Sequence, residues 1–153
     1  MQLTRFSDYS LRLLLYLATH PDRLVSVQEV SAAYGVSPHH MVKVVQLLVD
    51  QRLVASARGR GGGLRLNCPP GEINIGQVVR ATEPSFALVE CFDVLRNTCP
   101  IEPACGLKHT LLEAQRAFMA VLDKRTLADF LPRASGLIQL WSKRLEPIHD
   151  PTS

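Results

Sequence analysis

The chain has 153 residues and a formal net charge of +3, with 46% hydrophobic and 20% charged residues. This balance is typical of a globular protein and excludes a largely disordered chain, and the length allows one ordinary domain or a small domain with an added dimerisation element. The longest apolar run, residues 11–18, is interrupted by Arg12 and falls far short of the roughly 20 residues that span a bilayer. We therefore expect no membrane span and no secretory signal peptide. We also expect the chain to reside in the reducing cytoplasm.

Two helices are predicted before residue 35. The first contains residues 8–20, because leucines recur there at helical spacing, and Thr4 and Ser7 offer capping oxygens ahead of it. The second follows Ser26 and Glu29, whose spacing has the form of a capping box: the serine accepts a hydrogen bond from a free backbone N–H, and the glutamate reaches back. We expect a glycine to end this helix.

A third helix is predicted over residues 38–50, with Ser37 as its N-cap and a proline in its first turn. A helix, a glycine-containing turn and a polar-faced helix in this order indicate a helix-turn-helix. His39, His40 and Lys43 are the side chains that we expect near the bases or phosphates of DNA. The apolar stripe that faces the core comprises Met41, Val44, Val45, Leu48 and Val49.

Residues 53–66 contain two short strand candidates around a glycine-rich turn, with three arginines and no acidic residue. The pattern predicts a β-wing whose glycines allow a close approach to DNA and whose arginines, Arg58, Arg60 and Arg65, suit the minor groove. A flexible turn and a solvated face are the alternative interpretations. The preceding helix-turn-helix favours DNA, as does the charge: the chain up to the end of the wing carries eight Lys/Arg and four Asp/Glu, or +4, and the remainder nine and ten, or −1.

A short fourth helix is predicted over residues 75–82, with Asn74 as its cap. The cysteine segment follows, where Cys91, Cys99 and Cys105 are three of the chain's four cysteines and two prolines favour an irregular loop. Three thiolates in such a loop look like ligands of a metal centre, and soft sulfur suits zinc or iron–sulfur clusters better than magnesium or calcium. The spacing lacks the paired Cys-x-x-Cys motifs of zinc ribbons and points towards iron.

Several alternatives to an iron centre are open for these cysteines. They could form a disulfide framework, be ordinary apolar core residues, or act as a redox-switch pair with one spare thiol. A zinc site is the strongest alternative, with His109 as a fourth ligand beside the three cysteines. His109 also fits as an ordinary polar residue of the following helix, and Cys68, next to two prolines, is expected to have no part in the site.

A long helix is predicted over residues 107–124, with apolar residues at heptad-like spacing. Such a helix can pair with its twin in a homodimer, or its apolar stripe can belong to the core of one chain. Thr126 and Asp129 can cap a short further turn, which Pro132 is expected to break. Residues 136–145 carry a last amphipathic segment, and we expect the residues beyond it to fray.

Four segments of the chain match a known pattern: Met1-Gln-Leu-Thr-x-Phe-x-Asp8-Tyr, Tyr34-Gly-Val-Ser37-x-x-His40-Met-Val-Lys43, Arg58-Gly-x-x-Gly-Gly and Thr126-Leu-Ala-Asp129. With the winged helix, the cysteine segment and the long helix in this order, the chain is similar over nearly its whole length to the IscR/NsrR family of bacterial winged-helix transcription regulators. It resembles most the nitric-oxide-sensing repressors of that family.

The resemblance implies an iron–sulfur cluster, 2Fe–2S or 4Fe–4S, held by Cys91, Cys99 and Cys105 in a homodimer whose long helices pair. In similar proteins the fourth ligand can be an acidic residue near the N-terminus of the partner subunit, and the position that matches here is Asp8. The chain departs from the pattern between Cys91 and Cys99, where relatives usually have fewer intervening residues than the seven found here. This difference bears on the path of the loop.

The resemblance further implies a repressor that binds an inverted-repeat operator in double-stranded DNA as a dimer and releases it when nitric oxide attacks the cluster. Other interpretations are a cluster-occupancy sensor, a zinc-stabilised regulator without gas sensing, and an electron-transfer or redox enzyme. No catalytic constellation is recognisable in the sequence, so we do not expect an enzyme.

The predicted fold is therefore mainly α with a small β-wing, a winged helix-turn-helix plus a long dimerisation helix. We expect four parts: the winged helix-turn-helix (residues 1–66), a connecting helix with the cluster-binding cysteine loop (67–106), the dimerisation helix with a C-terminal helical segment (107–146), and a tail (147–153).

Overall fold

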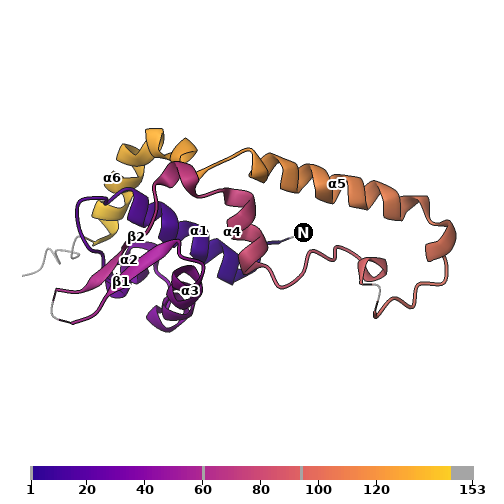
Figure 1. The fold of residues 1–153 in the computed structure, drawn as a ribbon, viewed down its shortest axis with the longest axis horizontal. Helices are drawn as coiled ribbons and strands as arrows, with labels where there is room; N and C mark the ends of the chain where they lie inside the picture. Colours follow the sequence, from indigo (N-terminus) through magenta and orange to yellow (C-terminus); the bar gives the residue numbers. More distant parts are fainter. Residues whose placement is uncertain (1, 60, 94, 146–153) are drawn as a thin grey trace, which may run out of the picture.

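The computed structural model describes residues 2–59, 61–93 and 95–145 and is mostly helical, with one small sheet (Figure 1). The predicted class, mainly α with a β-wing, is confirmed. No helix within these ranges combines the length and the apolar composition that crossing a bilayer requires. The helices are α1 (Arg5–Ala18), α2 (Val27–Tyr34), α3 (Pro38–Asp50), α4 (Ile75–Thr82), α5 (Gly106–Asp123) and α6 (Ala134–Leu145), and the strands are β1 (Val54–Ala57) and β2 (Gly63–Leu66).

Helix α1 is the centre of the core, because it contacts α3, α4 and β2. As predicted, Thr4 caps its N-terminus, accepting a hydrogen bond from the Ser7 amide at 3.2 Å. Leu13 and Leu14 are completely buried, and burial of each such side chain contributes about 1.5–3 kcal/mol. The Thr4 amide also donates to the carboxylate of Glu83 at 2.8 Å, which ties the start of α1 to the end of α4.

Helix α2 has only half of its predicted capping box. The Ser26 hydroxyl accepts from the Glu29 amide at 3.1 Å. The Glu29 carboxylate does not reach back, because it is ion-paired with Arg23 and accepts a hydrogen bond from the Tyr16 hydroxyl at 2.8 Å. Two partners from outside the helix have thus replaced the local cap. Gly35 ends the helix as expected, at a φ of 66° that favours glycine.

Helix α3 completes the helix-turn-helix and begins where the sequence predicts. Ser37 is its N-cap by position, although its side chain makes no capping hydrogen bond. The apolar stripe is confirmed, since one face of the helix enters the core. Met41, Val44 and Leu48 are fully buried, and Val45 and Val49 are half-buried.

The wing is a two-stranded antiparallel hairpin, and its turn needs glycine at specific positions. Gly59 and Gly61 have φ values of 96° and 82°, which other residues rarely adopt. A Cβ atom at Gly62 would lie 2.3 Å from the carbonyl oxygen of Ala57. The backbone conformation and close packing of the turn therefore explain why glycine occurs here, and a flexible turn is not needed to explain it. Arg60, predicted to serve the wing, lies outside the described residues.

The long helix α5 leaves the winged-helix body and lies beside the segment that leads to it. Residues 83–93 and 95–105 run outward from α4, and α5 returns alongside them (Figure 1). At its inner end, Arg80 of α4 makes two bonds to the carboxylate of Asp123, at 2.5 and 2.7 Å. Further out, the Gln115 side chain donates to the backbone carbonyl of Phe86. The helix is thus joined to the body at one end and to the outgoing segment along its side.

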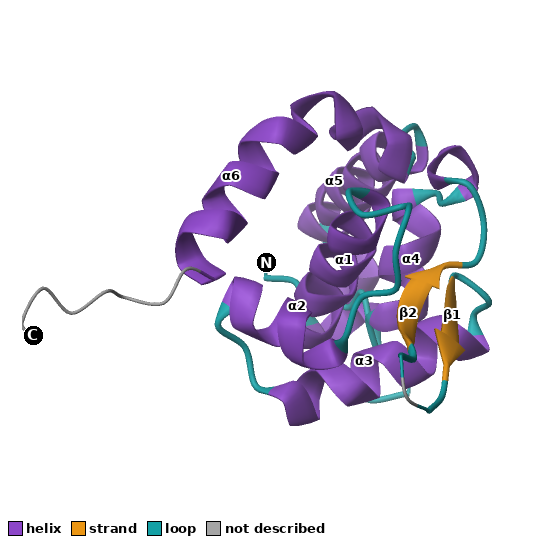
Figure 2. Cartoon of the chain, turned by 90° about the vertical axis from the view of Figure 1, so that its left-hand side faces the viewer, coloured by secondary structure: helices purple, strands orange, loops and turns teal. Residues whose placement is uncertain are grey.

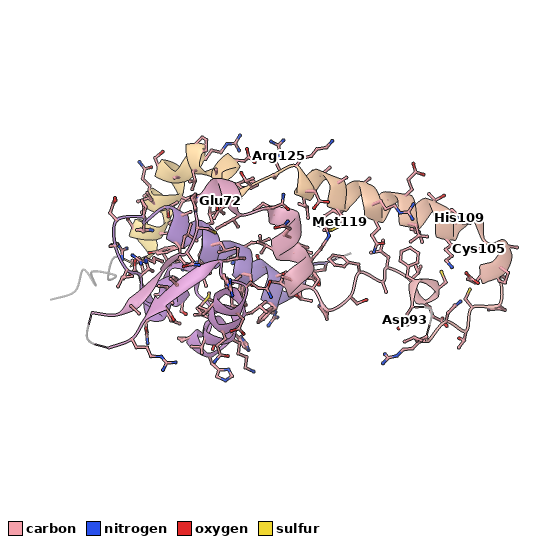
Figure 3. All side chains as sticks on the ribbon, viewed as in Figure 1. Glu72, Asp93, Cys105, His109, Met119 and Arg125 are labelled. Carbon is pink, nitrogen blue, oxygen red and sulfur yellow. The ribbon has the colours of Figure 1, made fainter. Side chains whose placement is uncertain are left out.

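Little of the α5 surface belongs to the core of this chain. Met119, near the body in Figure 3, is the buried residue of the helix. Leu107 and Val121 of the apolar stripe are 63% and 62% exposed. Intramolecular packing therefore leaves part of the predicted stripe uncovered.

A short 3₁₀ segment, η4 (Leu127–Arg133), connects α5 to α6. The Asp129 carboxylate accepts from the Thr126 amide at 2.8 Å and completes the predicted capping box. Pro132 lies inside this segment, so the expectation that it breaks the turn is wrong. A 3₁₀ segment tolerates the proline, which lies well into the turn and directly before α6.

The last helix, α6, packs on the winged-helix body rather than on α5 (Figure 2). Trp141, the single tryptophan of the chain, is buried with its ring centroid 4.7 Å from that of Tyr16 and 5.5 Å from that of Tyr34. Aromatic pairs at such distances stabilise a contact beyond the area they bury. The predicted tail, residues 147–153, lies outside the described residues.

Candidate functional site

The three side chains of α3 predicted to contact DNA, His39, His40 and Lys43, are all exposed. Burial of the opposite face of α3 fixes their direction. The rings of the two histidines lie 6.1 Å apart, so the cationic and polar groups are concentrated in the first two turns. Within the described residues none of the three is in an ion pair, which leaves them available to a polyanion.

The wing adds cationic groups next to α3. Strand β1 contacts α3, and the two strands lie beside that helix at the lower side of the molecule in Figure 2. Arg58 is exposed at the start of the turn, and Arg65 is exposed because it alternates with the buried Leu64 along β2. The structure thus places α3 and the described wing arginines on one connected surface.

The cysteine segment is irregular, as its prolines predict. Cys91 lies in a single 3₁₀ turn, η2 (Glu90–Phe92), and Cys105 follows another, η3 (Glu102–Ala104), directly before α5. Cys91, Cys99 and Cys105 are all free thiols and half-exposed. In the described part of the chain they are therefore neither disulfide-bonded nor buried core residues.

A hydrogen-bonded clasp closes the long interval between the first two cysteines. The Glu90 carboxylate accepts from the Thr98 amide at 2.7 Å and from the Thr98 hydroxyl at 2.5 Å. These two bonds hold the pKa of Glu90 below its usual value. Because Glu90 and Thr98 immediately precede Cys91 and Cys99, the clasp holds the residues before these two cysteines together.

Lys108, in the first turn of α5, brings a positive charge next to the cysteine segment. Its ammonium group is ion-paired with Glu102. The hydrogen bond to Glu102 raises the pKa of Lys108, as does the negative charge of Glu102. The structure places Lys108 and Cys91 at the edge of one hollow. It does not assemble three metal ligands anywhere among the described residues, so Cys99 is not brought into a completed site.

The donor chemistry of the segment nonetheless fits an iron–sulfur cluster. Three reduced, half-exposed sulfur atoms lie in one irregular segment, and a hollow of about 760 Å³ beside Cys91, Lys108 and Leu112 leaves space against α5. Thiolate ligands suit such clusters. The residues present are therefore compatible with the cofactor.

His109 and Cys68, the two other candidate ligands, do not join the three cysteines of the segment in the described residues. His109 is exposed at the outer end of α5, where Figure 3 also shows Cys105, and it joins no ligand group in the described residues. Cys68 packs against the core of the winged-helix body. Burial, followed by the charge of Glu72, raises the pKa of Cys68. The thiol is accordingly a poor metal ligand.

Asp8, the proposed fourth ligand, lies on α1. This helix lies in the winged-helix body, whereas the cysteine segment leads to the outer end of α5 (Figure 1). Both of its carboxylate oxygens bind Arg12, at 2.8 and 2.7 Å. The Arg12 guanidinium lies over the ring of Tyr34, 5.6 Å from its centroid, and the Tyr34 hydroxyl donates to the Arg12 carbonyl at 3.1 Å. Tyr34 is the last residue of α2. Asp8 is therefore linked through one arginine to the turn that precedes α3.

Sequence reasoning missed the partners that surround the predicted residues. Arg12 follows Asp8 by four positions, a spacing that places the two side chains together on a helix, so this pair was predictable. The Glu90–Thr98 clasp and the Glu102–Lys108 ion pair depend on how an irregular segment folds. No periodic pattern indicates them.

The sequence is similar to those of known transcriptional regulators. A profile of the Rrf2 family, described as an iron-dependent transcriptional regulator, matches residues 3–133. The HTH-type transcriptional regulator NsrR of Bacillus subtilis (strain 168) is 47% identical over 141 residues, covering 92% of this chain and 97% of that protein. The protein of the same name from Halalkalibacterium halodurans is 50% identical over 138 residues, covering 90% and 94%.

Solved structures have the same fold. T. potens IscR superposes with a TM-score of 0.70 at 24% identity, covering 88% of each chain. CymR, described as the global cysteine regulator of B. subtilis, superposes with a TM-score of 0.68 at 26% identity, covering 89% of this chain and 98% of that one. The family profile, over residues 3–133, spans the winged-helix body, the cysteine segment and α5.

Proposed function

The chain belongs to the Rrf2 family of iron-dependent transcriptional regulators and is not an enzyme, and on that premise we propose that it is an iron–sulfur-dependent repressor that senses nitric oxide and acts on DNA in the cytoplasm. The observation that carries the proposal is the set of three free, half-exposed cysteines in one irregular segment before α5. The curated relatives named NsrR, 47% and 50% identical over most of the chain, support it.

DNA binding uses the surface formed by α3 and the wing. His39, His40 and Lys43 enter or border the major groove, and Arg58, Arg60 and Arg65 serve the wing at the flanking minor groove. The exposure of the described members of this set, without ion-pair partners in the described chain, supports the assignment.

The repressor is a homodimer that pairs through α5. The helix extends from the body and leaves Leu107 and Val121 more than half exposed, and a second copy would bury such residues. A two-fold dimer presents two α3 helices, so the operator is an inverted repeat in double-stranded DNA.

Cys91, Cys99 and Cys105 would hold the cluster, with Asp8 of the partner subunit as the fourth ligand. When bound, the cluster would supply iron to which nitric oxide binds strongly. Asp8 would then have two competing partners, the cluster and Arg12 of its own chain. An Asp8 carboxylate free of the cluster makes both Arg12 hydrogen bonds, as it does in this structure. Because Arg12 also contacts Tyr34, the exchange alters the turn before α3 and the spacing of the two α3 helices.

The proposal is tested on anaerobically purified protein. We expect a brown protein with visible absorbance, iron and sulfide, whose binding to its operator weakens when nitric oxide is added. A colourless protein that holds zinc would instead favour a zinc-stabilised regulator. A brown protein that responds to loss of the cluster but not to nitric oxide would favour a cluster-occupancy sensor.

A further inference from the structure

A small pocket lies between α1 and α3. It measures about 280 Å³ and is lined by Arg5, Phe6, Tyr9, His40 and Lys43. The first three residues come from the start of α1 and the last two from the first half of α3. The ring of Tyr9 lies 6.5 Å from that of His40, so an aromatic contact joins the two helices at this point.

The pocket concentrates basic groups without an acidic one. Arg5, His40 and Lys43 line it, and no Asp or Glu does. Asp8 follows Arg5 by three positions, within reach on the same helix, but both of its carboxylate oxygens are bound by Arg12. In the described ranges Arg5 and Lys43 have no ion-pair partner. Two permanent positive charges and an imidazole at the edge of one hollow favour an external anion.

The position of the pocket indicates which anion. His40 and Lys43 belong to the face of α3 that contacts DNA in the proposed function, and Arg5 extends this face onto α1. An arginine binds phosphate oxygens through a fork of N–H donors, and a lysine does so as a point charge. Phosphates of the DNA backbone flank a helix that lies in the major groove.

We propose that Arg5, His40 and Lys43 form a binding site for one backbone phosphate of DNA, so that α1 holds the duplex together with α3. The proposal rests on the DNA-binding part of the proposed function, but not on the cluster. It gives α1 two roles, since the helix that carries Asp8 also carries a DNA contact one turn earlier. A displacement of α1 then changes a phosphate contact directly, as well as the turn before α3.

The test compares Arg5→Gln with Arg133→Gln, which makes the same charge change in η4. Arg133 is exposed, and η4 lies at the upper side of the molecule in Figure 1, opposite α3. Affinity for an operator duplex, selected by the protein from random DNA, and for a duplex of unrelated sequence is measured across a range of salt concentrations. Arg5→Gln should weaken binding to both duplexes by about three- to tenfold and lower the salt slope by roughly one unit, because one phosphate contact is lost. Arg5→Lys should keep most of the slope.

Several results would overturn the phosphate site. One is an Arg5→Gln protein with the affinity and salt slope of the parent, or with only the small change seen in Arg133→Gln. Another is a loss of affinity for the operator alone, which would assign Arg5 to base recognition. A third is saturable binding of inorganic phosphate that Arg5→Gln abolishes without any change in DNA binding. Thermal unfolding monitored by Trp141 fluorescence confirms that each variant is folded.

The outcome is independent of the sensing proposal. A parent protein that ignores nitric oxide, but loses one unit of salt slope in Arg5→Gln, contradicts sensing and supports the phosphate site. A parent protein that responds to nitric oxide, with an Arg5→Gln variant whose salt slope is unchanged, supports sensing and contradicts the phosphate site.

Discussion

Asp8 and Arg12 form a two-point ion pair one turn apart on α1, with Nε–Oδ1 and Nη2–Oδ2 distances of 2.8 and 2.7 Å. The side chains are 42% and 41% exposed, and pairs of this kind contribute only about 0.3–0.5 kcal/mol. A weak pair is well suited to a ligand exchange, because coordination of Asp8 to iron can displace it at little cost. The ion pair matters for signalling because Arg12 also contacts Tyr34.

Replacing Asp8 by alanine should therefore uncouple DNA affinity from the state of the cluster. We expect operator affinities before and after nitric oxide to become equal within about threefold, as measured by fluorescence anisotropy under nitrogen. Asp22→Ala is the matched control, since Asp22 is exposed and, in the described chain, has no ion pair. A parent-like response in Asp8→Ala would exclude Asp8 from the linkage.

Arg12→Gln tests the second step of the same connection. The variant keeps Asp8 as a ligand but removes the guanidinium that lies over Tyr34, so cluster content should match the parent while the effect of nitric oxide on operator affinity shrinks. Iron analysis and anisotropy are measured on the same sample. If cluster content is unchanged and the full response persists, Arg12 does not transmit the signal.

The Glu90–Thr98 clasp should hold the cysteine segment in order. Glu90→Ala removes the acceptor of both Thr98 hydrogen bonds, so the Thr98 amide should exchange with solvent faster and the visible absorbance should decay faster in air. Glu113→Ala, an exposed change on α5, serves as the control. Unchanged protection of the Thr98 amide would mean that the clasp is absent in solution.

The Arg23–Glu29 pair gives folding a defined pH dependence. The hydrogen bond from Arg23, and then that from Tyr16, hold the pKa of Glu29 below its ordinary value of 4.5. A lowered carboxylate pKa contributes stability above pH 4.5 that is lost as the pH falls through the lowered value. Glu29→Gln should cost about 0.5–1 kcal/mol at neutral pH, and the difference from the parent should vanish in acid. Trp141 fluorescence reports this unfolding, and a pH-independent difference would contradict the assignment.

The exposed stripe of α5 should be the dimer contact. Leu107→Glu and Val121→Glu place charges on residues that a second copy would bury, so sedimentation equilibrium should show dissociation at concentrations where the parent is a dimer. Leu140→Glu, at a 65% exposed position of α6, controls for added charge. If both α5 variants remain dimers, the dimer interface lies elsewhere on the chain.

Periodic features of the chain were predictable and contact-dependent ones were not. The buried faces of α1 and α3 could be predicted from the spacing of their apolar residues, because helical spacing decides which side chains share a face. Glu29 illustrates the limit: its local capping role lost to Arg23 and Tyr16, which the fold brings to it. Pro132 is similar, since a 3₁₀ turn tolerates a proline that was expected to break it.

The candidate site likewise contains features that the sequence predicts and features that depend on the fold. Exposure of His39, His40 and Lys43 follows from the periodicity of α3, whereas the placement of Cys91 and Lys108 at one hollow depends on an irregular path. The assembly of all three cysteines with an aspartate from another chain is a property of a dimer, which the sequence indicates only through resemblance. That assembly stays a prediction.

Anaerobic purification from iron-replete cells, with iron and sulfide analysis and a nitric oxide titration of operator binding on the same sample, tests the central claim most directly. We expect iron and sulfide in the parent, their loss when Cys99 is replaced by serine but not when Cys68 is, and release of the operator as nitric oxide reacts with the parent. Iron-free parent protein that stays on its operator whatever the nitric oxide concentration would contradict it.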